Sequence, residues 1–198
     1  MRLVLASQSA GRRKILANAG IVHDVMTALC NEEAEKEQLR AGGADARMLA
    51  LSLAEAKARS TSLACPGAFV LGCDQTLARE DGLMFDKARS MEEQAQHLRQ
   101  LSGRTHSLFA AMAIARDGEI IWRDAEEARM TMRPLSDTFI ADYLAAEGES
   151  LLSGVGGYRI EGRGIQLFEK IEGSHFTIIG LPLLPLLAFL RTAGVIAG

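Results

Sequence analysis

The sequence predicts an α/β fold built on a mixed β-sheet. Apolar segments of strand length alternate with helical segments in the first half of the chain, which favours strands joined by helices. In the middle, two long segments flank Asp117-Gly118, a dipeptide typical of an antiparallel hairpin. The length of 198 residues, with 48% apolar residues, allows one large domain or a tightly joined pair of lobes.

Each element is predicted from its own residues. Residues 2–6 are apolar enough for a buried strand, 7–11 form a turn, and 12–19 form a helix that Gly20 closes. The segment 31–40 is polar and acidic. The remaining predicted strands span 21–26, 68–73, 106–115, 119–132 and 176–179. The remaining predicted helices span 44–61, 90–101, 136–147 and 183–191. Ser90 is the expected N-cap of the helix 90–101, and Glu93 follows three residues later, which is the capping-box pattern.

Composition and charge disfavour several classes of protein. A net charge of −3 and only 5% aromatic residues disfavour a nucleic-acid binder. The three cysteines and four histidines show no spacing typical of a disulfide framework or a zinc site. No targeting segment is visible, and the apolar stretch 176–190 is shorter than the ~20 residues of a membrane span. We therefore expect a cytoplasmic protein that binds neither membrane nor nucleic acid.

The first candidate site lies where a strand passes through a small polar turn into a helix, over residues 7–14. Free N–H groups and the positive end of the helix dipole make such a place an anion site. Arg12, Arg13 and Lys14 oppose that dipole, and a bound polyphosphate would compensate for them. Ser9 acting only as a helix cap, with solvated cations around it, explains the same residues equally well. No GxxxxGK[ST] motif is present.

Asp74 and Lys57 are the next candidates. Asp74 follows the apolar run 69–73, so we expect it at the carboxyl end of a buried strand, where open α/β sheets bind ligands. There it would hold a divalent metal or take a proton from water, and a turn-forming aspartate is the alternative. Lys57 shares the apolar face of the predicted helix 44–61. By default its ammonium extends to solvent, and the alternative is that it reaches into a cleft.

Acidic side chains and a further lysine complete the set. Glu32 and Glu33 lie in a run that is mostly a solvated face, although one of its carboxylates is a candidate second metal ligand. Lys87 is an isolated candidate. Metal-assisted phosphate chemistry uses a phosphate cradle, carboxylates and lysines, and the candidates include all three. These residue types do not indicate which bond is broken.

Taken in order, these residues resemble the Maf (septum-formation-inhibitor-like) family of nucleoside triphosphate pyrophosphatases over nearly the whole chain. The resemblance rests on the order and spacing of its motifs. They are Leu5-Ala6-Ser7-Gln8-Ser9 with Arg12-Arg13, Leu53-Ala54-Glu55-Ala56-Lys57-Ala58, Leu71-Gly72-Cys73-Asp74-Gln75, Leu101-Ser102-Gly103, Gly157-Tyr158-Arg159-Ile160-Glu161-Gly162-Arg163-Gly164, and Ile171-Glu172-Gly173 through Gly180-Leu181-Pro182. The resemblance implies one domain over residues 1–198, with a strongly twisted mixed sheet in two lobes around a central cleft, and a homodimer.

The resemblance also implies a reaction. A nucleoside triphosphate would be hydrolysed between its α and β phosphorus atoms, giving a monophosphate and pyrophosphate, with a divalent cation, Mg or Mn, as cofactor. Asp74 would be the proton acceptor that activates water. The metal would be held by Asp74 and by an acidic position that falls on Glu32, with Glu33 as the alternative.

Binding roles are implied in the same way. Ser9, Arg12 and Arg13 would hold the triphosphate, while Lys57 and Lys87 would neutralise charge on the leaving pyrophosphate. A nucleotide-binding regulator of cell division that does not catalyse hydrolysis is the alternative function.

Substrate choice is implied to depend on three positions, Gly11, Gln75 and Glu161. Asp-Gln at 74–75 and the sequence around Glu161 are more similar to the branch that acts on 7-methyl-GTP than to the dTTP/UTP branch, which is the alternative substrate class. The sequence differs from the former branch at Gly11, where a bulky aromatic residue is usual.

Overall fold

The computed structural model describes all 198 residues and has the α/β architecture with a mixed sheet that the sequence predicts. The order of the seven-stranded sheet is β2-β1-β3-β5-β6-β7, and β4 pairs with β3 outside this order. The strands are β1 (Leu3–Ala6), β2 (Asp24–Val25), β3 (Phe69–Arg79), β4 (Met84–Phe85), β5 (Thr105–Arg116), β6 (Glu119–Met132) and β7 (Phe168–Glu172). The helices are α1 (Ala10–Asn18), α2 (Glu32–Ala41), α3 (Ala46–Leu63), α4 (Met91–Leu101), α5 (Asp137–Glu147), α6 (His175–Ile179) and α7 (Leu183–Thr192), with short 3-10 helices at Gly148–Ser153 and Arg163–Leu167.

The chain forms two compact units. The first consists of Met1–Gln75, Phe109–Glu127 and Ser174–Gly198, and the second of Thr76–Leu108 and Ala128–Gly173. The boundaries fall inside β3, β5 and β6, so each of these strands contributes residues to both units. The central cleft implied by the family resemblance stays a prediction.

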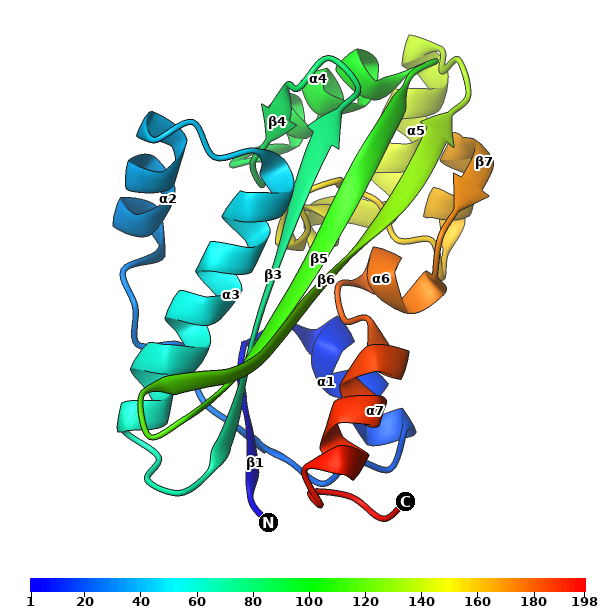
Figure 1. Cartoon of the computed structure of the whole chain (residues 1–198). Coiled ribbons are helices and arrows are strands. Elements are labelled where there is room, and N and C mark those ends of the chain that lie inside the picture. The colour runs from blue at the N-terminus through cyan, green and yellow to red at the C-terminus, as the bar shows by residue number, and fades with distance from the viewer. The chain divides into compact units, whose positions relative to one another are not determined.

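In the first unit, β1 lies between β2 and β3 and runs parallel to both. Leu3–Ala6 is in register with Phe69–Gly72 of β3. Figure 1 shows α3 on one face of this part of the sheet and α1 and α7 on the other. Because both faces are covered, β3 begins with a continuous apolar run rather than with alternating polar and apolar residues.

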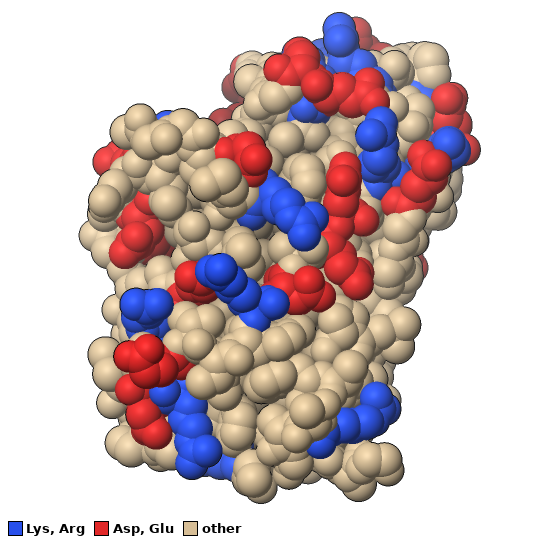
Figure 2. All heavy atoms as spheres, in the orientation of Figure 1, with Lys and Arg blue, Asp and Glu red and all other residues tan.

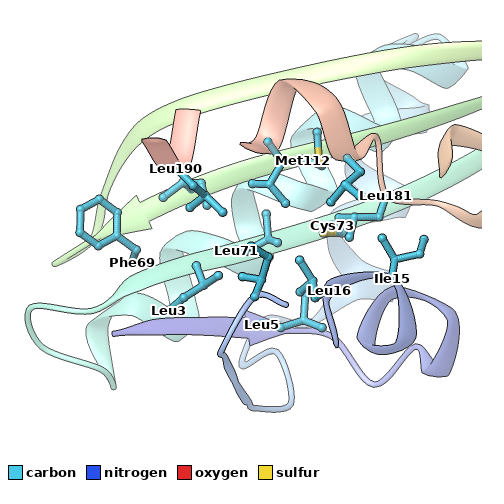
Figure 3. Packing of buried hydrophobic residues seen from close by; sticks show 14 residues of the cluster. Leu3, Leu5, Ile15, Leu16, Phe69, Leu71, Cys73, Met112, Leu181 and Leu190 are labelled. Atoms are coloured by element: carbon cyan, nitrogen blue, oxygen red, sulfur yellow. The ribbon is translucent and has the colours of Figure 1, made fainter. Parts of the chain in front are cut away.

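One hydrophobic layer joins the sheet to α1 and α7. Figure 3 shows Leu5 and Leu71 of the sheet beside Leu16 of α1, with Leu190 of α7 nearby. All four side chains, and that of Met112, are fully buried. This layer holds α1 against β1.

On the opposite face, α3 packs through alanines against the alanines of β5, and Gly72 permits an unusually close approach to β3. A Cβ atom on Gly72 would lie 2.2 Å from the carbonyl oxygen of Ala54 and 2.6 Å from the nitrogen of Ala58. The main chain of α3 therefore rests directly on β3. This contact places Lys57, the neighbour of Ala58, over the strand that carries Asp74.

In the second unit, β3 pairs antiparallel with β4, and β6 pairs antiparallel with β7. The predicted capping box at the start of α4 is present in part: Ser90 Oγ accepts a hydrogen bond from the nitrogen of Glu93 at 3.1 Å. The carboxylate of Glu93 accepts from the nitrogen of Arg89, the residue before the cap, at 2.7 Å, and not from that of Ser90. His106 of β5 is fully buried, with its Nε2 atom 2.7 Å from the hydroxyl oxygen of Tyr158.

Five segments differ from the prediction. The segment 176–179, predicted as a strand, lies in α6, because Ser174 caps the helix start and Gly180 ends it in the left-handed conformation at φ 101°. The acidic segment 31–40 forms α2, which Asn31 caps. The predicted strand 68–73 continues to Arg79, and β4 and β7 were not predicted.

Charged side chains of both signs are interspersed on the face of the molecule shown in Figure 2. The protein also has exposed ion pairs, among them Arg2 with Asp24 and Arg129 with Glu80. Such exposed pairs each contribute little to stability. None of the helices has the length and hydropathy needed to cross a membrane.

Candidate active site

A buried lysine lies between two carboxylates in the first unit. Lys57 and Asp74 are each only 7% exposed. Lys57 Nζ donates a hydrogen bond to Asp74 Oδ1 at 2.6 Å and forms a second ion pair with Glu32 Oε2 at 2.8 Å. The default expectation that Lys57 extends to solvent is therefore wrong, and the lysine reaches inward.

Three elements bring these side chains together. Asp74 was predicted at the carboxyl end of its strand, but it lies within β3, which continues to Arg79. Its parallel partner β1 ends earlier, at Ala6, which pairs with Gly72, so Asp74 lies just beyond the carboxyl end of β1. This is the position at which open parallel sheets bind ligands. Glu32 is the first residue of α2, where the cap of Asn31 begins the helix.

The electrostatic surroundings perturb both members of the buried pair. Burial raises the pKa of Asp74, and the attraction of Lys57 and Arg12 offsets only part of that effect. Burial acts to lower the pKa of Lys57, but the carboxylates of Asp74 and Glu32 outweigh it, so the pKa is raised. Lys57 therefore stays a cation at neutral pH, held by two carboxyl groups.

Glu32 and Glu33 occupy different surroundings. Glu32 contacts Lys57, whereas Glu33 contacts Lys36 at 3.4 Å with 80% of its side chain exposed. Consecutive residues on a helix point in different directions, so only one of the two reaches the buried lysine. The geometry places Glu32, not Glu33, beside Asp74.

The start of α1 forms the second part of the site. Ser9 is its N-cap, and its hydroxyl accepts a hydrogen bond from the nitrogen of Arg12 at 3.4 Å. The first turn contains no acidic residue, and Arg13 and Lys14 are exposed. Ser9 is thus a helix cap, as one of the two interpretations requires, and the positive end of this helix also carries a cluster of cations.

Arg12 is held in place by three acceptors from three parts of the chain. Its Nη1 donates to Ser7 Oγ at 3.1 Å and to the carbonyl oxygen of Cys73 at 3.0 Å. Its Nε donates to the carbonyl oxygen of Gly180 at 2.9 Å. These bonds join the start of α1 to the strand residue that precedes Asp74.

Two positions predicted to select the substrate contact α6. The side-chain nitrogen of Gln75 donates to the carbonyl oxygens of Thr177 and Ile178, each at 3.0 Å. Gly11 faces the same helix, since a Cβ atom on it would lie 3.0 Å from Ile179 Cγ2. Both positions are thus occupied by contacts within the protein, and their predicted roles remain predictions.

Lys87 and Glu161 belong to the second unit, and both are exposed there. Lys87 follows β4. Glu161 lies in a turn before the 3-10 helix Arg163–Leu167. Their predicted roles stay predictions.

Sequence reasoning missed the residues that support Arg12, above all Gly180, Thr177 and Glu126. Thr177 is fully buried, and its hydroxyl donates to Glu126 Oε2 at 2.6 Å. The signal available was local: Ser174 and Gly180 flank a five-residue segment as a helix start and stop. The partners of that segment lie too far away in the sequence for any spacing rule to find them.

The carboxylates fit a divalent cation. No group of three or more His, Cys, Asp and Glu side chains gathers anywhere in the chain. Mg²⁺, however, usually binds through one or two carboxylates together with substrate phosphates. Asp74 and Glu32 already share one cation, the ammonium of Lys57, which shows that their oxygens converge on a position suited to positive charge.

The chain is similar to known proteins over its whole length. It is 49% identical to a nucleoside triphosphate pyrophosphatase of Sphingopyxis alaskensis over 98% of each chain. It is 51% identical to a 7-methyl-GTP pyrophosphatase of Mesorhizobium japonicum, over 100% of this chain and 98% of the relative. It is 49% identical to a 7-methyl-GTP pyrophosphatase of Rhizobium meliloti, over 98% and 97% of the two chains.

Among solved structures, a nucleoside-triphosphatase / dITP/XTP pyrophosphatase from Mycobacterium abscessus aligns with 67% of this chain and 73% of its own, at 19% identity and a TM-score of 0.36. The family model described as "Maf-like protein" matches residues 2–193. With relatives near half identity over the full length as well, the chain belongs to the Maf-like protein family.

Proposed function

We propose that this protein is a nucleoside triphosphate pyrophosphatase, which hydrolyses the bond between the α and β phosphorus atoms to release a nucleoside monophosphate and pyrophosphate. The observation that carries the proposal is the buried Lys57–Asp74 pair just beyond the carboxyl end of β1. Relatives of about 50% identity named for this activity support it.

The triphosphate binds at the start of α1. The N–H groups of the first turn and the helix dipole attract the phosphate oxygens. Arg12 and Arg13 add cationic donors, and a planar guanidinium pairs well with phosphate oxygens. The three bonds that hold Arg12 fix its direction before the nucleotide arrives, which lowers the entropy lost on binding.

Asp74 takes the proton from the attacking water. A raised pKa makes its carboxylate a stronger base than an exposed aspartate, while the positive charge of Lys57 favours the ionised form. Lys57 engages Oδ1, so Oδ2 is the atom that accepts the proton. Lys57 also supplies positive charge beside the phosphates as negative charge moves onto the leaving pyrophosphate.

Asp74 and Glu32 would hold the divalent cation, Mg or Mn. When bound, such a cation polarises phosphoryl oxygens and neutralises their charge.

We further propose a methylated guanine nucleotide, 7-methyl-GTP, as the substrate, with dTTP and UTP as the alternatives. The support is the name of the relatives from M. japonicum and R. meliloti. Cytoplasmic location and assembly as a homodimer stay predictions, and analytical ultracentrifugation tests the second.

Pyrophosphate release across a panel of common and methylated triphosphates, with Mg²⁺ or Mn²⁺, tests the proposal. Asp74→Asn is expected to lower turnover by about 10²–10⁴-fold while nucleotide binding persists, because a general base is removed. Wild-type turnover in this variant would refute the role of Asp74. No product from any nucleotide would favour a binding regulator instead.

Glu32 and Glu33 provide a matched pair of variants. Glu32→Gln removes a carboxylate that contacts Lys57, whereas Glu33→Gln makes the same change one residue along on an exposed side chain. We expect Glu32→Gln to raise the Mn²⁺ concentration required for half-maximal turnover and Glu33→Gln to leave it unchanged. Equal effects of both changes would contradict the metal role of Glu32.

A further inference from the structure

A short turn supports Arg12 from the far side of α1. The turn consists of Ser174–Gly180 and contains α6, which has only five residues. Its end is closed by two main-chain bonds: the nitrogen of Gly180 donates to the carbonyl of Thr177 at 3.0 Å, and the nitrogen of Leu181 donates to that of Phe176 at 3.0 Å. This arrangement is a Schellman motif, for which Gly180 has the required positive φ.

The carbonyl oxygen of Gly180 is one of the three acceptors that hold Arg12. Gly180 lies close to the guanidinium, because a Cβ atom on Gly180 would be 3.5 Å from both Nε and Nη2 of Arg12. Nε and Nη1 of the guanidinium are engaged by the protein, so Nη2 is the edge that is left to meet a phosphate. Any displacement of Gly180 therefore redirects that edge.

Gln75 holds the turn at its end. A helix leaves its last carbonyl groups without partners inside the helix. Here the Gln75 amide nitrogen donates to the carbonyl of Ile178 and adds a bond to that of Thr177, which also accepts from the nitrogen of Gly180. The amide oxygen of Gln75 also lies close to Gly180, because a Cβ atom on that glycine would be 3.4 Å from it. A second anchor, Thr177 Oγ1 to Glu126, ties the turn to β6.

We propose that Gln75 is a positioning residue for Arg12: it fixes the Ser174–Gly180 turn so that Gly180 holds the guanidinium in the direction that grips the triphosphate. The inference rests on the proposed function, since it needs Arg12 to bind phosphate. It differs from the expectation that Gln75 selects the base, because its amide nitrogen is bound to main-chain carbonyl oxygens. Gln75 then affects every nucleotide equally.

Inorganic tripolyphosphate, which has no base, is the probe that separates the two roles. Isothermal titration calorimetry is carried out on the wild type, on Gln75→Met, which keeps the length but loses the donor, and on Gln100→Met as a control at an exposed position of α4. We expect Gln75→Met to weaken tripolyphosphate binding about tenfold, the effect of losing one to two ordinary hydrogen bonds. Its kcat/KM values for 7-methyl-GTP and dTTP should fall by a common factor, and Gln100→Met should match the wild type.

A double-mutant cycle with Arg12→Met distinguishes positioning from general loosening of the fold. If Gln75 acts through Arg12, Gln75→Met costs nothing further in tripolyphosphate affinity once Arg12 is absent. Additive losses, or wild-type tripolyphosphate binding by Gln75→Met with an altered ratio between the nucleotides, would overturn the inference. A wild type that fails to bind tripolyphosphate would instead remove the proposed phosphate site and the inference with it.

Circular dichroism of each variant checks folding. If Gln75→Met fails to fold, Thr177→Val replaces it, because it removes the link to Glu126 and keeps the carbonyl that Gln75 binds. We expect Thr177→Val to weaken tripolyphosphate binding as well, by less than Gln75→Met would. In the Arg12→Met background we expect it to have no further effect on the affinity. Unchanged affinity in Thr177→Val would then overturn the inference.

Discussion

Replacing Lys57 by methionine removes the cation between two carboxylates and keeps a long, unbranched side chain. Asp74 then remains buried without its main partner, whereas Glu32 retains access to water, since 43% of its side chain is exposed. Removing one member of a buried ion pair costs about 3–5 kcal/mol, and an exposed pair contributes at most about 1 kcal/mol. We therefore expect the free energy of unfolding to fall by about 3–5 kcal/mol at pH 7, mostly because of Asp74.

The loss has a defined dependence on pH. Without Lys57 the pKa of Asp74 rises further above its usual 3.8, so folded Asp74 keeps its proton at pH values where the unfolded chain has lost it. Stability of the variant then falls as pH rises from 3.8 through the raised pKa. The difference from wild type is expected to be smaller at pH 5 than at pH 8.

Urea denaturation followed by circular dichroism at both pH values measures the effect. The double variant Lys57→Met with Asp74→Asn should recover most of the lost stability, because it leaves no uncompensated buried charge. A loss below about 1 kcal/mol at pH 8, or a double variant no more stable than Lys57→Met alone, would refute the electrostatic reasoning.

Three further experiments test other features of the molecule. Gly72→Ala places a methyl group 2.2 Å from the carbonyl of Ala54, so α3 must move by about 1 Å, and we expect a loss of about 3 kcal/mol in urea denaturation together with reduced turnover. Burial lowers the pKa of His106 to about 4, so wild-type stability should fall by on the order of 3 kcal/mol as pH decreases from 6.5 to 4, and His106→Leu should abolish that slope. Burial raises the pKa of Cys73 to about 11, so a thiol reagent at pH 8 should label half-exposed Cys30 slowly and leave Cys73 unlabelled until the protein unfolds, which mass spectrometry of peptides can check.

Local patterns predicted those parts of the fold that depend on neighbouring residues. The cap at Ser90 and the hairpin at Asp117-Gly118 are present because each is formed by groups a few residues apart. The strand prediction for 176–179 was wrong. The apolar and β-branched residues of this segment favour a strand, while a donor to its helical carbonyls comes from Gln75, 102 residues away. Contacts of that kind leave no periodicity in the sequence.

The candidate site follows the same division. Glu32, Lys57 and Asp74 were singled out as residue types and by family resemblance, but no spacing rule could show that one ammonium contacts both carboxylates. Their meeting depends on how closely α3 approaches β3 at Gly72, a property of packing. The choice between Glu32 and Glu33 likewise required the direction of α2, since both residues suit a metal equally by chemistry.

The bond between Arg12 and the carbonyl of Gly180 joins residues 168 positions apart, and this span governs when Arg12 can be held in place during synthesis. After residue 12, a ribosome must add a further 168 residues to reach the partner, Gly180. Until then the nascent chain carries an arginine at the start of α1 without one of its three holders. A product that terminates before residue 180 would therefore lack one of the three acceptors of Arg12 even where most of its sheet had folded.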